Sequence, residues 1–204
     1  MKGNKKIRMA GLLAICLLLV ACLIGFFYRP GTSPANSQTD RSAFRKDAYV
    51  SINHQIYTKK EYTDFQRMQN LVRKENKLPK LTKKEMDERF VAHQVPLLLA
   101  KKEHLQVSRK EAVNYTAKMH KAYDRSASKQ EKNFLNHSLH WLGLSEEAYW
   151  HIAAVSGYRE ALTLSKLKGA YYAQKLSGQG KEDLIPWSQY QKSLIKKARV
   201  IWFK

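Results

Sequence analysis

The sequence predicts a mainly α-helical domain that follows a transmembrane helix and contains a small two-stranded antiparallel sheet. Three observations support this prediction. An uncharged apolar run of twenty residues lies near the N-terminus, at 9–28. A helix-starting pattern, Thr or Ser followed three positions later by Glu, occurs at Thr58, Thr82 and Ser108. Residues suited to strands lie at both ends of the remaining chain.

The apolar run at 9–28 predicts a helix that crosses a membrane. At about 1.5 Å of rise per residue, twenty residues span about 30 Å, which matches the hydrocarbon thickness of a bilayer. The run of a cleaved secretory signal is usually only ~7–15 residues long. The tail 1–8 carries four cations and no anion, so it should stay in the cytoplasm. We therefore expect a single-pass protein of the cell membrane with an extracytoplasmic C-terminal domain.

A lipid anchor is the alternative. Residues 19–22, Leu-Val-Ala-Cys, resemble a bacterial lipobox, in which Cys22 would be acylated and become the new N-terminus. Residues 23–28 stay apolar, however, where a lipoprotein normally turns polar. The uncleaved helix is therefore the favoured interpretation, and both interpretations tether the rest of the chain to a membrane.

The chain beyond the anchor divides into a spacer and one domain. Residues 29–42 are rich in Pro, Gly, Ser, Asn and Thr, a composition typical of a flexible linker. Residues 43–204 are long enough for one domain with a core of its own. Both cysteines lie within 9–28, so this domain has no disulfide, metal thiolate or cysteine nucleophile.

The charge of the domain points to anionic partners. Residues 43–204 carry about +15 of the net charge of +20. This excess suits anionic lipid headgroups, anionic envelope polymers or acidic polypeptides. The basic residues are spread along the chain as pairs, without a recognisable nucleic-acid-binding module, which argues against nucleic acid as a partner.

The first elements of the domain follow in order. Residues 48–52 alternate apolar and polar and predict a strand, followed by a turn at 53–55. A helix should start after Thr58 and stop before Pro79, because proline disfavours helical backbone at the preceding residue. Thr58 and Glu61 have the spacing of a capping box, in which each side chain bonds the backbone amide of the other residue.

The next two helices carry the same start signal. One should begin after Thr82 and contain Pro96, which predicts a kink near 92–96 because proline removes a backbone bond and crowds the preceding turn. The other should begin after Ser108. Both have apolar residues at helical spacing, which in the first include Leu97 and Leu98.

The remaining helices are predicted at 129–142, from 146 to about 176, and at 187–198. Gly143 is a natural C-cap for the first of these. Ser145 and the carboxylates that follow it suit the positive end of the second, although the reciprocal Glu of a capping box is missing.

The chain closes on a second strand. Residues 200–203 have strand-forming side chains, and a lone strand would leave its backbone groups unpaired. We therefore predict that 49–52 and 200–203 pair as an antiparallel sheet, which joins the two ends of the domain.

Three segments in this order resemble the SurA N-terminal domain family, the chaperone module of SurA and PrsA-type foldases, which is distantly like the C-terminal region of trigger factor. Residues 49–62 resemble the family's opening strand, V-N-G-x-x-I-T, with His54 where Gly is common. Residues 97–108, LLLAKKEHLQVS, resemble its "LLLxxAKKxGIxVS" helix exit. Residues 142–149, LGLSEEAY, resemble its "LGLSEEEY" entry into a long helix. The resemblance covers nearly all of 48–203.

The resemblance implies a chaperone-like module that holds exported unfolded polypeptides. In that family a parvulin-type prolyl isomerase domain normally follows the helical module or precedes its last helix. Only 177–186 separates the last two predicted helices, which leaves no room for an isomerase. We therefore expect a non-catalytic protein. The alternative is an envelope scaffold or interaction protein that binds a folded partner or an anionic wall polymer.

No motif indicates catalysis or a cofactor. The sequence has no nucleophile elbow, P-loop or Rossmann glycine pattern. His137 and His140 are three residues apart on a predicted helix, but no carboxylate is obviously placed to complete a metal site with them. We expect no metal and no cofactor.

Aromatic side chains are the candidate client contacts. An exposed aromatic platform would suit unfolded segments, because chaperone grooves expose apolar surface that ordinary monomers bury. The alternative is that most of these rings belong to the core, given their helical spacing. The candidates are Trp141, Trp150, Tyr171, Tyr172 and Trp187.

Overall fold

The structure, a computed structural model, describes residues 47–178 and 185–203, without the side chains of Trp141 and 175–178. The predicted cytoplasmic tail 1–8, membrane helix 9–28 with Cys22, and linker 29–42 therefore lie outside the described residues. Among the residues that the structure does describe, no helix has both the length and the apolar character needed to cross a bilayer.

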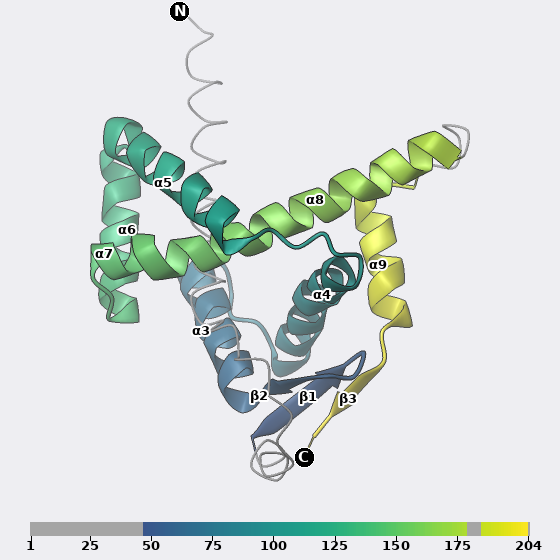
Figure 1. Ribbon diagram of the computed structural model, residues 1–204. Helices are drawn as coiled ribbons and strands as arrows, with labels where there is room; N and C mark the ends of the chain where they lie inside the picture. Colours follow the sequence, from purple (N-terminus) through teal and green to yellow (C-terminus); the bar gives the residue numbers. More distant parts are fainter. Residues whose placement is uncertain (1–46, 179–184, 204) are drawn as a thin grey trace, which may run out of the picture.

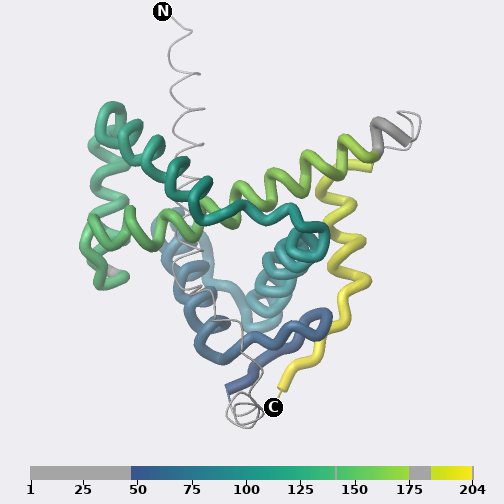
Figure 2. The backbone as a smooth tube through the Cα atoms, in the orientation of Figure 1, coloured from purple at the N-terminus to yellow at the C-terminus, as the bar shows by residue number. Residues whose placement is uncertain are grey.

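The described chain is mainly helical with one small antiparallel sheet, which confirms that part of the predicted class. In Figure 1 the long helix α8 crosses the molecule, with α3, α4 and the sheet on one side of it and α9 descending from its far end toward the sheet. The tube in Figure 2 shows the same path. The helices are α3 (Lys59–Glu75), α4 (Lys83–Lys102), α5 (Arg109–Ser126), α6 (Lys129–Leu142), α7 (Glu146–Ala148), η3 (Tyr149–Ala153), α8 (Ala154–Gly178) and α9 (Trp187–Lys197).

The sheet joins the two ends of the domain, as predicted. Strand β1 (Ala48–Ile52) pairs antiparallel with β3 (Val200–Trp202), with Val50 opposite Trp202. The predicted number of two strands is wrong, because β2 (Gln55–Thr58) also pairs with β1, and the order is β2-β1-β3.

A two-residue turn explains the third strand. Asn53 and His54 connect β1 to β2, and both have positive φ, at 48° and 70°. Positive φ at both turn residues is typical of the tightest hairpins, where Asn-Gly is the favoured pair. His54 stands at the position where glycine is favoured, so the sequence signal for this hairpin is weak.

Capping boxes start four helices. The predicted boxes at Thr58, Thr82 and Ser108 all form, with each hydroxyl accepting from the N3 amide and each N3 Glu accepting from the N-cap amide. A fourth box, which was not predicted, joins Ser128 and Glu131. Ser145 accepts from the Ala148 amide without a reciprocal bond, as predicted.

The long helix predicted from 146 to about 176 is interrupted by the five-residue π-helix η3. A π-turn inserts one extra residue into a helix and so rotates the side chains that follow it. Tyr149, Trp150, Ala153 and Ala154 are all buried around this insertion. They join the core formed with residues of α3, α5 and α6.

A second core lies between the sheet, α3 and α4. Phe90 is its centre, because the ring is 1% exposed and meets Tyr57, Tyr62 and Phe65 edge to face, with ring centroids 5.2–5.4 Å apart. Half-buried residues of α9 pack against the same cluster. α4 continues through Pro96, which is itself buried.

Left-handed residues that follow helices provide a first test of the fold. Lys77 follows α3 with φ of 53°, and the Leu78 amide donates to the Arg73 carbonyl at 2.8 Å, a helix end that favours glycine. The left-handed backbone costs a side-chain-bearing residue about 1–2 kcal/mol, and glycine avoids this cost. The greater flexibility of glycine in the unfolded chain offsets part of the resulting stabilisation. We expect Lys77→Gly to raise the free energy of unfolding by about 0.5–1 kcal/mol, measured by urea denaturation.

The matched control is the opposite kind of substitution, from glycine to a residue with a side chain, at the end of another helix. Gly143 ends α6 with φ of 67°, and a Cβ added there would meet no atom within 4 Å. Gly143→Ala therefore carries only the backbone cost, and we expect it to destabilise by about 1 kcal/mol. A loss of stability in Lys77→Gly would show that the lysine side chain contributes more than its backbone costs.

Candidate functional site

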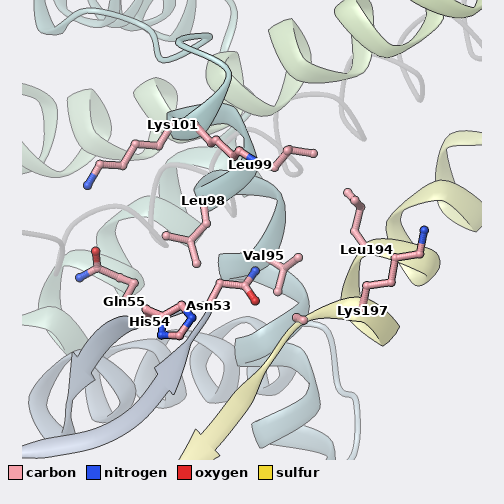
Figure 3. Close-up of a pocket in the computed structure, with 11 residues that line it drawn as sticks. Asn53, His54, Gln55, Val95, Leu98, Leu99, Lys101, Leu194 and Lys197 are labelled. Atoms are coloured by element: carbon pink, nitrogen blue, oxygen red, sulfur yellow. The ribbon is translucent and has the colours of Figure 1, made fainter.

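A groove between α4 and α9 is the candidate site that brings together the most distant parts of the chain. We call it the α4–α9 groove, and it encloses about 470 Å³ (Figure 3). Its lining comes from three separate parts of the chain, the β1–β2 turn, the C-terminal half of α4 and the end of α9. The lining residues are Asn53, His54, Gln55, Val95, Leu98, Leu99, Lys101, Lys102, Leu194, Lys197 and Ala198.

The floor of the groove is apolar. Val95, Leu98 and Leu99 lie three and four residues apart on α4 and therefore share one face. Leu194 on α9 points toward this face across the gap between the helices (Figure 3). Val95 is buried, whereas the leucines are only half-buried. The floor therefore keeps apolar surface that a ligand could cover.

The edge of the groove is cationic. Lys101 and Lys102 end α4, Lys197 ends α9, and all three are exposed. None of the described residues that line the groove carries a carboxylate. An apolar floor beside three ammonium groups is complementary to a ligand that combines apolar and acidic groups.

Two hydrogen bonds and apolar packing fix the walls of the groove. The Asn53 amide donates to the Arg199 carbonyl at 2.9 Å, and the Arg199 amide donates to Asn53 Oδ1 at the same distance. The turn is thus tied to the segment directly after α9. Leu194 and Ile195 pack against the core that contains Phe90. The groove is therefore formed before a ligand enters it, which lowers the entropic cost of binding.

A second, smaller hollow lies on the other side of Leu98, between α4 and α8. Arg159 and Thr163 of α8 both bond the loop between α4 and α5. Arg159 Nε donates to the Val107 carbonyl at 2.8 Å, and the Val107 amide donates to Thr163 Oγ1 at 3.0 Å. On the same face of α8, Glu160 Oε2 lies 3.2 Å from His93 Nε2 of α4. These contacts position α8 against the helix that carries the groove floor.

Thr163→Val tests the bond between α8 and this loop. The substitution keeps the shape of the side chain but leaves the Val107 amide, in a residue that is 1% exposed, without its acceptor. An unpaired buried amide costs about 1–3 kcal/mol, and we expect that loss in urea denaturation. Thr163→Ser keeps the hydroxyl and should retain most of the stability. Unchanged stability in Thr163→Val, together with a loss in Thr163→Ser, would contradict this prediction and assign the contribution of Thr163 to packing of its methyl group.

The predicted aromatic contacts lie elsewhere. Trp150 is 3% exposed and stacks on His120, with ring centroids 4.3 Å apart. Tyr171 is also buried, and its hydroxyl donates to the Ile185 carbonyl. Tyr172 and Trp187 are half-buried and join α8 to the start of α9, since the Trp187 amide donates to the Tyr172 hydroxyl at 3.1 Å. None of the four lines the α4–α9 groove, and the Trp141 side chain lies outside the described residues.

The sequence did contain a signal for the groove. Leu97, Leu98 and Leu99 are followed closely by two lysines, and three consecutive helical positions cannot all face one core. At least one leucine of the run had to remain accessible beside the lysines. Helical spacing instead predicted Leu97 and Leu98 on the apolar side of this helix, and the segment also carries part of the family resemblance.

Neither a metal-binding cluster among the described residues nor a known relative indicates the function of this groove. Over 47–178 and 185–203, no group of three or more His, Cys, Asp or Glu side chains could hold a metal ion. No protein-family model, curated protein or solved structure gives a significant match to this chain. The resemblance to the SurA N-terminal domain family stays a prediction that rests on the three sequence segments.

Proposed function

We propose that this protein holds segments of exported, incompletely folded polypeptides in the α4–α9 groove, without catalysing a reaction. The observation that supports the proposal best is the composition of the groove. Its floor of half-buried leucines would gain about 25 cal/mol for each Å² of apolar surface covered. Its lysines would attract acidic segments and increase their rate of encounter.

The size of the groove suits reversible holding. A cavity of about 470 Å³ has room for a few side chains only, so most of a client would remain outside it. Contacts of this size give weak and rapidly reversible binding, as a chaperone that must release its client requires. The apolar run 9–28 and the linker 29–42 would keep the groove close to the outer side of the membrane, where exported chains emerge.

Suppression of aggregation tests this function. The full chain would be placed in lipid nanodiscs, and light scattering by reduced α-lactalbumin would be followed at physiological salt, with empty nanodiscs as the reference. We expect the protein to suppress the scattering. A double variant, Leu98→Gln with Leu194→Gln, should lose most of this effect because both floor leucines become polar. Leu78→Gln, at an exposed leucine outside the groove, should retain it.

Two results would contradict the proposal. Absence of suppression, together with binding to a polyglycerol phosphate polymer, would support the envelope scaffold instead. Acceleration of prolyl isomerisation in a tetrapeptide substrate would show that the protein is an enzyme.

A further inference from the structure

The open edge of β3 is the feature that carries a further inference. Among the described strands, in the order β2-β1-β3, strand β3 has a neighbour on one side only. The Phe203 amide donates to the Tyr49 carbonyl, and the Asn53 amide donates to the Arg199 carbonyl, both at 2.9 Å. Residues 199, 201 and 203 therefore turn their backbone groups toward β1.

The backbone groups of Val200 and Trp202 consequently face away from β1, since these directions alternate along a strand. No described residue forms a recorded hydrogen bond with these outward N–H and C=O groups. Figure 1 places β3 on the side of β1 opposite to β2. An edge with unpaired backbone groups is a template for another extended chain.

A hollow beside this edge continues the inner face of the sheet. We call it the α4–β3 groove, and it encloses about 590 Å³. Val200 and Trp202 lie opposite Ile52 and Val50, so all four side chains share the face that covers the core. Trp202 remains 37% exposed. A fourth strand would place its alternate side chains in this groove, next to Trp202 and between Val91 and Ile195.

The charges of the α4–β3 groove are balanced. Lys83 Nζ lies 2.7 Å from Asp87 Oδ2 and 5.6 Å from the centre of the Trp202 ring. The hydrogen bond to Asp87 raises the pKa of the Lys83 ammonium, which therefore stays charged and paired at neutral pH. Lys84 and Glu88 add one charge of each sign. A ligand side chain that lies in the α4–β3 groove should therefore be uncharged. The α4–α9 groove, in contrast, favours an acidic ligand.

We propose that the open edge of β3 binds an extended polypeptide segment as a fourth strand, with alternate uncharged apolar side chains in the α4–β3 groove. A second copy of this chain fits less well. A stable dimer buries about 800 Å² on each partner, far more than an edge of three residues and one hollow provide. The proposal does not depend on client holding in the α4–α9 groove, because different residues line the two grooves.

A proline substitution tests the backbone contact. Val200→Pro removes an outward N–H but leaves the ladder to β1, which uses residues 199, 201 and 203. Val200→Thr changes the side chain and keeps the N–H. The probe is a fluorescein-labelled peptide of alternating valine and threonine with Gly-Ser ends, titrated by fluorescence anisotropy against the full chain in nanodiscs. We expect Val200→Pro to weaken binding at least tenfold and Val200→Thr less than threefold.

A second measurement does not depend on the folding of the variant. Peptide methylated at the alternate backbone nitrogens that would pair with β3 should fail to bind the unmodified protein. Unmodified peptide should slow hydrogen exchange of the Val200 and Trp202 amides. The variant Leu98→Gln with Leu194→Gln should bind the peptide normally, which separates this site from the α4–α9 groove.

Three results would overturn the proposal. Equal binding by the protein and its Val200→Pro variant is the first, provided that circular dichroism shows both to be folded. The second is unchanged exchange at both amides. The third is a dimer in sedimentation that dissociates on Val200→Pro without peptide, which would assign the edge to a second copy.

Discussion

Phe90→Ala is expected to lower the free energy of unfolding by about 3–5 kcal/mol, the range measured for large buried aromatic residues. The ring is 1% exposed, so the truncation would leave a cavity in the core. It also removes three edge-to-face contacts, with Tyr57, Tyr62 and Phe65. Such pairs contribute more than their buried area alone. A domain of this size is usually stable by about 5–15 kcal/mol, so a large part of its stability would be lost.

The measurement is urea denaturation followed by circular dichroism. Val113→Ala is the control, because Val113 is exposed on α5 and its truncation should change stability by less than about 0.5 kcal/mol. The partners of Phe90 lie on β2 and α3, so the loss should also loosen the hairpin whose turn borders the α4–α9 groove. A loss below about 1 kcal/mol would contradict the packing of this core.

The helix boundaries could be predicted because their signals are local. A capping box needs only four consecutive residues, and the boxes at Thr58, Thr82 and Ser108 all form. The pairing of the two terminal strands followed from the need to satisfy their backbone groups. The π-helix at Tyr149–Ala153 could not be predicted in this way, since it depends on how two bulky side chains, Tyr149 and Trp150, and two small ones, Ala153 and Ala154, reach the core together.

The buried face of α4 was predicted only in part, for a physical reason. Helical spacing placed Leu97 and Leu98 in the core, but Val95, Pro96 and Ala100 are the buried residues in that half of the helix. α4 contacts α3, α8, α9 and β1, so its environment surrounds the helix and no single apolar stripe describes it. Leu98 and Leu99 lie between these contacts and form part of the floor of the α4–α9 groove.

The site itself was missed because its parts are distant in sequence. The turn at Asn53 and the end of α9 meet only after β3 pairs with β1. Aromatic residues were predicted to be client contacts. Trp150 instead belongs to the core, and Tyr171 packs at the junction of α8 with α9. Helical spacing cannot separate these roles, because core and exposed aromatic residues follow the same period.

Charge reversal at the edge of the α4–α9 groove is expected to have the largest effect on client holding. In the triple variant Lys101→Glu, Lys102→Glu and Lys197→Glu, three attractive charges become repulsive toward an acidic client. At about 0.5–1 kcal/mol for each exposed charge, affinity for reduced α-lactalbumin should fall roughly ten- to hundredfold. Reduced lysozyme, a basic client of similar size, should bind equally well or more tightly. Binding of fluorescently labelled clients to the full chain in nanodiscs measures both.

The control variant changes the same charge elsewhere. Lys118, Lys121 and Lys129 are exposed on α5 and α6, and their replacement by Glu gives the same net charge without touching the groove. We expect this control to weaken binding of the acidic client less than threefold, because surface charges more than about 8 Å away are largely screened at physiological salt. The difference between the two variants should shrink as salt is raised. Equal losses in both would show that the client responds to overall charge, and that the α4–α9 groove is not where it binds.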